Sequence, residues 1–486
     1  MSGKVYWSQE QIDEYIRMVE EYDNREELKV DMHNHTTGSD GEDSPLMLLL
    51  RAHRMGLNTI SITDHNKLDG YHILQEQIEK TLTSMEEIDS RNDLTPEEKE
   101  KNIRGAKRLL NVIEEMNIVP GCEVLTTFKG CPYVEILAYG VDINQLEEKL
   151  KNEREGLDSP GQKIYEGLKE NIKKYGIKID EFFMENRSDY RKMFFHELIR
   201  HPENAYLYEK IEGKTEKEKA EQFARQYLDN PESDFYVDLG NSSTRKAEMQ
   251  KMIQRHPDLV FDQDIIKNAG SASGQFYTEL KKYPENEPLI DRRIDSLKKF
   301  NYLGLYNEKS PFFVDLSSTK PSPESVIRVI HEAGGKALVA HWGRYLLSNE
   351  DVFDWRTEQG RKNLEDIIDM CDGAECAYPD NPMELRRLIY NLCKEKGKFI
   401  SIGGDNHGKA GKEGKQYQLG SQSGREVKEL KWIKETIISG KEFLKQSEEE
   451  NHYRDRLKKI IEKNRNESQK NLTNDKESEI QSEQGE

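Results

Sequence analysis

The sequence has few of the features that mark secreted, membrane-bound or disulfide-stabilised proteins. Only five of its 486 residues are cysteines, and these are scattered and form no CxxC pair. No apolar run is long enough to span a bilayer, and the first ten residues lack the character of a signal peptide. We therefore expect reduced thiols, no cysteine-based zinc site and a cytoplasmic location.

Common catalytic signatures are absent as well. The chain contains no GxSxG nucleophile elbow, no GxxxxGK[ST] phosphate-binding loop and no cysteine–histidine pairing motif, so covalent serine or cysteine catalysis and P-loop chemistry have no support. A formal charge of −19, with 34% of residues charged, favours solubility and disfavours indiscriminate binding to nucleic acid or anionic membranes. A locally basic cleft is still compatible with this charge.

Short apolar segments alternate with helical segments in two separate parts of the chain. The helices begin with caps such as the Ser-Pro pair at 44–45. The order strand, helix, strand favours parallel pairing, and about seven such strands are typical of an α/β barrel. The predicted strands are 28–33, 58–66, 117–127, 132–142, 336–341, 372–379 and 397–408.

A long segment of different composition separates the two parts of the predicted barrel. It is rich in Lys, Glu, Asn and Tyr and has helical periodicity with Pro and Gly breaks. The last part of the chain is polar without an apolar face and is predicted to be disordered. The predicted organisation is an N-terminal helix at 1–27, a barrel at 28–141 and 311–446, a mostly helical insertion at 142–310 and a polar tail at 447–486.

Side chains that bind metals follow several of the predicted strands. In VDMHNHTTGSDG (30–41), His33 and His35 lie two residues apart on a strand, so both imidazoles point to the same side and suit a divalent metal. A surface turn with two histidines is the alternative. Because the carboxyl ends of barrel strands meet on one face, the other strand-end groups favour the metal site. They are Asp40, Asp64, His65, Glu123, His341, Asp405 and His407.

In this order, the segments resemble the polymerase and histidinol phosphatase (PHP) family of metal-dependent phosphoesterases. The likeness runs through DMHNHTTGSDG, ISITDHN, GCEVLT, PSPESVIRVIHEAGGKALVAH, GAECAYP and GGDNHG, and it covers residues 28–70, 118–142 and 318–408. The resemblance implies a distorted seven-stranded (β/α) barrel of PHP type. It also implies two or three divalent ions (manganese, zinc or iron) at the rim where the strands end.

The resemblance further implies which residues hold each ion. The implied sets are His33, His35 and Asp405 for a first ion, Glu123 and His341 for a second that Glu123 bridges to the first, and Asp40, His65 and His407 for a third. Two positions depart from the family pattern. Glu135 stands where a histidine ligand of the second ion is common, so it either binds a harder metal or leaves only two ions. Trp342 replaces a proline, and it either lines the substrate pocket or packs in the core.

The implied activity is hydrolysis of a phosphate ester by a metal-activated hydroxide. Arg344, in the motif AHWGRY, is the candidate clamp for the substrate phosphate. Asp64 is expected to orient a ligand or a bound water, and Asp64, His65 or a metal-bound water would protonate the leaving group. His196, in the insertion, is a further candidate substrate contact, although a half-buried helical histidine is the commoner case.

Three hypotheses differ in what the barrel acts on. The first substrate is a small phosphomonoester or nucleotide. The second is a nucleic-acid end, cut by an exonuclease or end-processing enzyme, because residues 187–208 are locally basic and aromatic. The third hypothesis is a binding or regulatory module that has lost catalysis, and only Glu135 hints at it. A protein partner would dock on the insertion or the tail, and no membrane partner is expected.

Overall fold

The computed structural model describes most of the barrel and of the insertion. The described residues are 29–408, except 92, 187–188, 238–244, 263–270 and 348, and beyond them 419–422, 432–433 and 438–439. The helix predicted at 1–27 and the tail predicted at 447–486 lie outside them. Among these residues, no helix is both long and apolar enough to cross a bilayer.

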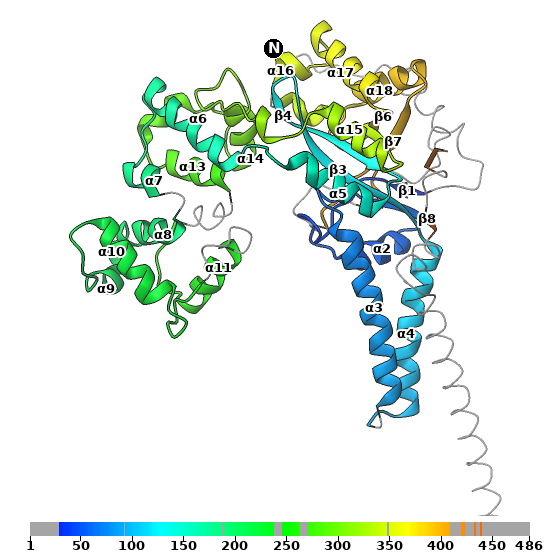
Figure 1. Ribbon diagram of the computed structural model, residues 1–486, viewed down its shortest axis with the longest axis horizontal. Coiled ribbons are helices and arrows are strands. Elements are labelled where there is room, and N and C mark those ends of the chain that lie inside the picture. The colour runs from blue at the N-terminus through cyan, green and yellow to red at the C-terminus, as the bar shows by residue number, and fades with distance from the viewer. Residues whose placement is uncertain are drawn as a thin grey trace, which may run out of the picture.

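Seven strands form a nearly closed barrel whose spatial order follows the order in the chain (Figure 1). Only β4 is antiparallel to its neighbours β3 and β5. The barrel closes where the segment after β1 meets the end of β7 and the loop that follows it, because Met32 N donates to Ile402 O at 3.0 Å and His35 N donates to Asn406 O at 2.9 Å. The predicted seven-stranded α/β barrel is thus confirmed. The strands are β1 (Val30–Asp31), β2 (Thr59–Ile62), β3 (Asn117–Phe128), β4 (Cys131–Tyr139), β5 (Lys336–Val339), β6 (Gly373–Ala377) and β7 (Phe399–Ile402).

Two features of the sheet go beyond the predicted pattern. Lys129 and Gly130 form a two-residue turn between β3 and β4, and both have positive φ, 50° and 79°, as a tight hairpin requires. A short further strand, β8 (Ile438–Ser439), pairs antiparallel with the first two residues of β3. A strand of two residues has no alternating pattern, so β8 could not be predicted.

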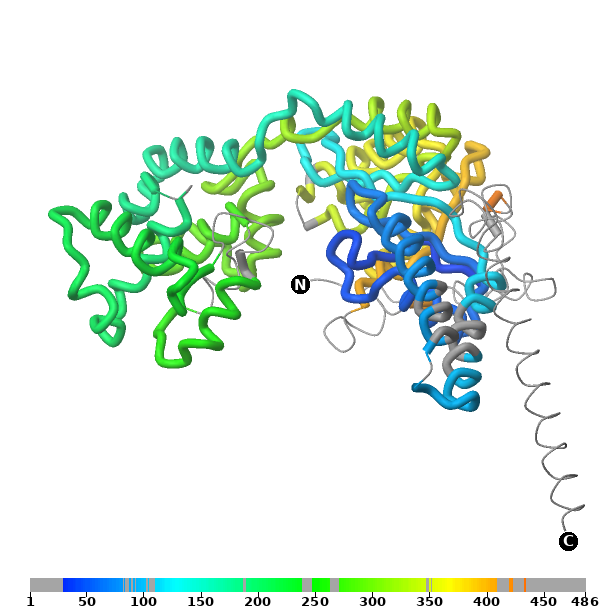
Figure 2. The backbone as a smooth tube through the Cα atoms, turned by 60° about the horizontal axis from the view of Figure 1, so that its bottom comes forward, coloured from blue at the N-terminus to red at the C-terminus, as the bar shows by residue number. Residues whose placement is uncertain are grey.

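Amphipathic helices cover the outside of the barrel. The predicted cap at Ser44 is present, since its Oγ accepts from Met47 N at 3.3 Å. A further cap lies at Thr95, whose side chain forms a capping box with Glu98. Two long helices, α3 and α4, form a hairpin that projects away from the barrel (Figures 1 and 2). The helices are α2 (Pro45–Arg54), α3 (Asp69–Ser90), α4 (Pro96–Glu115), α5 (Ile143–Arg154), α15 (Pro323–Glu332), α16 (Glu350–Phe353), α17 (Glu358–Met370) and α18 (Met383–Glu395).

The boundary of the insertion differs from the predicted one by one helix. The pattern assigned α5 to the insertion, but α5 packs against α15, and its Leu146 and Leu150 belong to the barrel core. Residues 142–154 therefore complete the barrel. Their composition is as polar as that of the insertion, and only two buried leucines distinguish them.

The rest of the insertion is helical and stands beside the barrel as a separate lobe (Figure 2). It contains two apolar clusters, one around Phe276, Phe300 and Phe312 and one around Phe194 and Phe223. Its α-helices are α6 (Pro160–Tyr175), α7 (Glu181–Asn186), α8 (Tyr190–Ile199), α9 (Ala205–Tyr208), α10 (Glu216–Phe223), α11 (Arg245–Arg255), α13 (Ala272–Leu280) and α14 (Leu297–Lys299), with two π-helical turns, η2 (Ala224–Leu228) and η4 (Phe300–Leu305).

Candidate metal centre

The side chains predicted to bind metals converge at one end of the barrel. The segments that follow β1, β2, β5 and β7 supply the five histidines and two of the carboxylates, and the antiparallel pair β3 and β4 supplies the other two carboxylates. All nine lie in groups whose nitrogen and oxygen atoms are within 4.8 Å of one another. The nine are His33, His35, Asp40, His65, Glu123, Glu135, His341, Asp405 and His407.

Glu123 occupies the middle of the cluster. Its Oε1 lies 2.8 Å from His341 Nε2 and 3.3 Å from His33 Nε2. Its Oε2 lies 3.0 Å from His65 Nδ1 and 3.3 Å from His35 Nε2. Each carboxylate oxygen therefore faces a different pair of imidazoles, which is the arrangement needed to bridge two ions.

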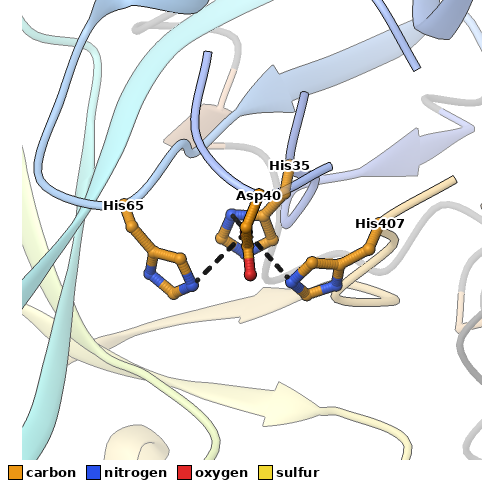
Figure 3. Close-up of side chains that lie close together, drawn as sticks. All are labelled: His35, Asp40, His65 and His407. Carbon is orange, nitrogen blue, oxygen red and sulfur yellow. Dashed lines mark ion pairs between the residues drawn. The ribbon is translucent and has the colours of Figure 1, made fainter. Parts of the chain in front are cut away.

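Two aspartates complete the cluster on the side of β7. Asp405 Oδ1 lies 3.1 Å from His35 Nε2 and 3.6 Å from His33 Nε2. Asp40 Oδ1 lies 3.3 Å from His407 Nε2 and 3.8 Å from both His35 Nδ1 and His65 Nε2. Figure 3 shows Asp40 between the three imidazoles. The Asp40 side chain is 53% exposed, so this group opens towards solvent.

Glu135 also points into the cluster. Its Oε2 lies 3.2 Å from His341 Nε2, and its Oε1 lies 3.7 Å from His65 Nδ1. Burial and the neighbouring charge of Glu123 raise the pKa of Glu135, because a second carboxylate nearby disfavours ionisation. A cation between the two carboxylates would relieve this repulsion, so Glu135 fits the ligand role that the sequence left open.

Several buried atoms of the cluster have no hydrogen-bond partner among the described residues. Buried polar atoms in proteins are almost always paired, and unpaired ones call for an explanation such as an ion. Here the unpaired atoms belong to neighbouring side chains that face one another, and imidazole nitrogens and carboxylate oxygens together suit manganese, iron or zinc. They are His33 Nε2, His35 Nδ1 and Nε2, His65 Nδ1, Glu123 Oε2 and Asp405 Oδ1.

Opposite charges also stabilise the cluster. Burial opposes protonation of His65, but Glu123, Glu135 and Asp40 outweigh it and raise the pKa of His65 to about 10. Burial likewise disfavours the charged form of Glu123, yet His33 and the neighbouring imidazoles lower the pKa of Glu123 well below its usual range. Protons and metal ions compete for the same lone pairs, so metal binding at this site should release protons.

Glu375, on β6, supports the cluster and was not singled out in the sequence. Its Oε1 lies 3.0 Å from His33 Nδ1, and its Oε2 accepts from His341 N at 3.0 Å. The first contact fixes the His33 ring so that Nε2 faces the cluster. The sequence does contain one indication of this role, because Glu375 is the single charged residue in the strand GAECA.

Asp31 supports the same face from β1 and was also missed. Its carboxylate accepts from the backbone N–H groups of His33 at 3.3 Å, Gly404 at 3.1 Å and Gly420 at 2.7 Å. Burial raises its pKa to about 6, although these three donors favour the charged form. Asp31 thereby ties the first two ligands to the loop that carries Asp405 and His407.

Asp64, predicted to orient a ligand and also a candidate proton donor, lies beside the cluster with both oxygens engaged. Oδ1 accepts from Thr36 N at 2.7 Å and from Ser39 Oγ at 2.6 Å, and Oδ2 accepts from Thr36 Oγ1 at 2.6 Å. These contacts hold the turn that precedes Asp40. Asp64 is thus placed to orient a ligand, and its role as a proton donor stays a prediction.

Trp342 and His196 do not face the cluster as substrate contacts. Trp342 is 1% exposed and packs against Phe128, Tyr345 and Phe353, so the packing alternative holds. His196 lies in α8 of the separate lobe, where Nε2 is 3.4 Å from Asp180 Oδ2 and Nδ1 pairs with Glu216. The sequence could not show that α8 turns this histidine towards its own lobe.

Arg344 lies next to the cluster, as predicted for a phosphate clamp. It donates to Asp405 Oδ2 at 2.9 Å, and the same oxygen accepts from the Tyr378 hydroxyl at 3.0 Å. Arg344 Nε is buried and has no acceptor in the described part of the chain. A donor of this kind beside the carboxylates is suited to an anionic ligand.

Comparison with known proteins adds only distant likenesses. No protein-family model matches the chain, and no curated protein matches it. A candidate metal-dependent phosphoesterase from Bifidobacterium adolescentis is 16% identical with a TM-score of 0.39, over 84% of this chain and 96% of that one. An amidohydrolase from Chromobacterium violaceum with bound sulfate is 17% identical with a TM-score of 0.40, over 85% and 98%. TM-scores below 0.5 do not establish a shared fold, so membership of the PHP family stays a prediction from the motifs.

Proposed function

We propose that this protein is a divalent-metal-dependent hydrolase of phosphate esters, with a small phosphomonoester or nucleotide as substrate. The observation that carries the proposal is the group of unpaired, mutually facing imidazole and carboxylate atoms around Glu123, with Arg344 beside it. Imidazoles and carboxylates alone would suit many metal enzymes. The buried arginine donor next to them favours a substrate with a tetrahedral anion.

The candidate ligands form four overlapping groups around such an ester. The first is His33, His35 and Asp405, and the others are His33, Glu123 and His341; His65, Glu123 and Glu135; and His35, Asp40, His65 and His407. Bound divalent ions would lower the pKa of a water and neutralise the ester oxygens. Since groups share residues, we propose two or three ions, and their identity among manganese, zinc and iron is part of the test.

Arg344 would orient the phosphate. Its guanidinium already contacts Asp405, which places it beside the ligands of the first group, and its unpaired Nε can donate to a phosphate oxygen. A planar guanidinium matches two oxygens of a phosphate at once. The leaving group would depart towards the exposed side of the cluster, where the His65 side chain is 25% exposed and the Asp40 side chain 53% exposed. His65 is therefore our candidate for protonating it.

The test compares the hydrolysis of several esters by the same protein. Protein stripped with a chelator and reloaded separately with manganese, zinc or iron is given a mononucleotide, a 5′-phosphorylated oligonucleotide and a carboxylic ester, and products are resolved by chromatography. We expect phosphate from the mononucleotide only after metal is restored. Hydrolysis of the carboxylic ester alone, or turnover that the chelator does not affect, would contradict the proposal.

The structure weakens the sequence support for the other two hypotheses. Residues 187–208 suggested a basic, aromatic groove for nucleic acid, but Arg191 pairs with Asp189 and Asp229, and Arg200 with Asp180. The aromatic rings of this segment include Phe194 and Phe195, which are buried. The idea of an inactive module rested on Glu135 alone, and Glu135 points into the cluster with the other candidate ligands.

A further inference from the structure

Asp405 divides its two carboxylate oxygens between different partners. Oδ1 faces two candidate ligands, at 3.1 Å from His35 Nε2 and 3.6 Å from His33 Nε2. Oδ2 accepts from Arg344 Nη1 at 2.9 Å and from the Tyr378 hydroxyl at 3.0 Å. One oxygen is therefore directed at the candidate metal centre, and the other is held from behind by two donors.

The backbone at Asp405 also depends on its surroundings. Its φ is 51°, in the left-handed region that residues other than glycine rarely adopt. Such a conformation persists where neighbouring contacts determine it, and it is often found at functional sites. Asn406, the next residue, provides part of the support, because its N–H donates to His33 O at 3.3 Å and its O accepts from His35 N at 2.9 Å. The hydrogen bonds to the Asp405 carboxylate supply the rest.

Tyr378, which directly follows β6, is itself fixed in the barrel. Only 1% of the residue is exposed, and its carbonyl accepts from Arg386 Nη2 at 2.6 Å and from Asn381 N at 3.0 Å. Its ring lies beside that of His341, with 4.9 Å between the ring centroids. The hydroxyl is thus presented to Asp405 from a rigid part of the structure.

The two donors to Asp405 differ in what else they can bind. Arg344 is the proposed phosphate clamp, and its side chain is 21% exposed. A bound phosphate would compete with Asp405 for the guanidinium, because both are anions that match its donors. Tyr378 is neutral and buried, so an anionic substrate would not draw its hydroxyl away from Asp405.

We propose that Tyr378 is a positioning residue that keeps Asp405 directed at the metal centre while Arg344 binds the substrate phosphate. A hydrogen bond behind a ligating carboxylate orients it and tunes the affinity for the metal. The Tyr378 hydroxyl is placed to do this whether or not the guanidinium is engaged elsewhere. The inference rests on the proposed function, because it assumes that Asp405 binds an ion and Arg344 a phosphate.

The chain offers a matched pair of variants for the test. Tyr378→Phe removes the hydroxyl and keeps the buried ring. Tyr165→Phe removes a hydroxyl that donates to Met184 O at 2.8 Å in the insertion, and so also loses one hydrogen bond, away from Asp405. Both full-length variants and the wild type are stripped of metal and titrated calorimetrically with manganese, first alone and then with saturating inorganic phosphate. Thermal stability is recorded for each.

We expect Tyr378→Phe to weaken manganese binding by about tenfold in the absence of phosphate, the lower end of the loss usual for a group that supports a ligand. With phosphate present, the ratio of its Kd to that of the wild type should rise by about a further threefold, because Arg344 then supports Asp405 less. Tyr165→Phe should match the wild type in both titrations. A purely packing role of Tyr378 predicts wild-type affinity in Tyr378→Phe. That result, or a Kd ratio that phosphate leaves unchanged, would overturn the inference.

A second background tests whether the phosphate dependence acts through Arg344. In an Arg344→Gln background the guanidinium supports Asp405 in neither condition, so Tyr378→Phe should weaken manganese binding by the same, larger factor with and without phosphate. A Kd ratio that still rises with phosphate would contradict the division of roles between Arg344 and Tyr378. Failure of the proposed function is recognised separately, because a wild-type protein that binds no manganese or no phosphate contradicts that function before any variant is compared.

Discussion

The barrel and the insertion both bury histidines beside carboxylates, with opposite results. In the insertion, His196 has two acidic partners, Asp180 and Glu216, and stacks on Phe182 at a ring distance of 4.7 Å. In the barrel, His35 has contacts with three carboxylates and yet both of its ring nitrogens lack a hydrogen bond among the described residues. The first arrangement is an ion-pair network, and the second is a set of lone pairs that converge on shared points.

The difference shows that proximity of histidine and carboxylate does not by itself indicate a metal site. What distinguishes the barrel is that one carboxylate, Glu123, serves four imidazoles, so its charge cannot be satisfied by simple pairing. In the insertion the acids also contact lysine and arginine, as with Lys282 beside Glu197 and Glu279 and Arg200 beside Asp180. His196 Nε2 and Glu279 Oε1 lack a hydrogen bond there too, but among the described residues they belong to no group of facing ligand atoms like those of the barrel.

The largest expected effect comes from removing the first two ligands. The double variant His33→Ala/His35→Ala should lose bound metal and lower the turnover of a phosphate ester by about 10³-fold or more, because bound ions supply several kcal/mol of transition-state stabilisation. Metal content is measured by mass spectrometry and turnover by phosphate release.

The matched control is His53→Ala/His72→Ala. These two histidines are exposed and each contacts a single glutamate, Glu115 or Glu147. Both metal content and turnover should stay within twofold of the wild type. Equal losses in the two double variants would mean that folding is affected and would break the comparison between buried and exposed histidines.

The next largest effect is expected on the stability of variants at Trp342. Trp342→Ala should lower the free energy of unfolding by about 3–5 kcal/mol, since it removes a fully buried indole from a packed aromatic cluster. Trp342→Phe should lose less free energy of unfolding than Trp342→Ala and should keep the KM of the wild type. Urea unfolding and steady-state kinetics check both values. A raised KM in Trp342→Phe without loss of stability would restore the substrate-stacking role.

The sequence sufficed to predict the barrel from local signals. It also sufficed to predict where the candidate ligands meet, from the strand ends together with the resemblance to the PHP family. Apolar strands with caps and turns between them predicted all seven strands of the barrel, and each ligand follows or lies within one of them. Barrel geometry then brings strand ends together whatever their distance in the chain. The nine residues predicted as ligands accordingly lie in four overlapping groups of neighbouring side chains.

The orientation of individual side chains, and the residues that support the ligands, could not be predicted from the sequence in the same way. Asp64 is one residue from a ligand, but only the fold shows that its oxygens point towards Thr36 and Ser39. His196 has the sequence neighbours of a binding residue, and its partners come from α10 and from the segment before α7. Glu375 was missed because its role depends on a contact with His33, which lies 342 residues away in the sequence. Tertiary contacts of this kind leave no periodic pattern in the sequence.

Glu375 therefore gives a sharper test of how the barrel is preorganised. Glu375→Gln removes the charge that faces His33 Nδ1 and should weaken metal binding by about 10- to 100-fold, the usual cost of losing a carboxylate behind a ligating histidine. Metal titration followed by calorimetry measures the change. Glu324→Gln, at an exposed position on α15, is the control and should bind metal as the wild type does. Equal affinities in the two variants would remove Glu375 from the site.

The smallest expected effect is a pH dependence in the insertion. Burial opposes protonation of His196, but Asp180 and Glu216 outweigh it and raise its pKa above 6.5. Protonated His196 therefore stabilises the fold, fully below the unfolded pKa of about 6.5 and less as pH rises through the folded pKa. Thermal unfolding from pH 5.5 to 9 should show the wild type more stable than His196→Gln by about 1–2 kcal/mol at low pH, with the gap closing as pH rises. His196→Gln should bind as much metal as the wild type, because its partners are acids of the insertion alone. A gap that is independent of pH, or a loss of metal, would mean that His196 belongs with the barrel histidines.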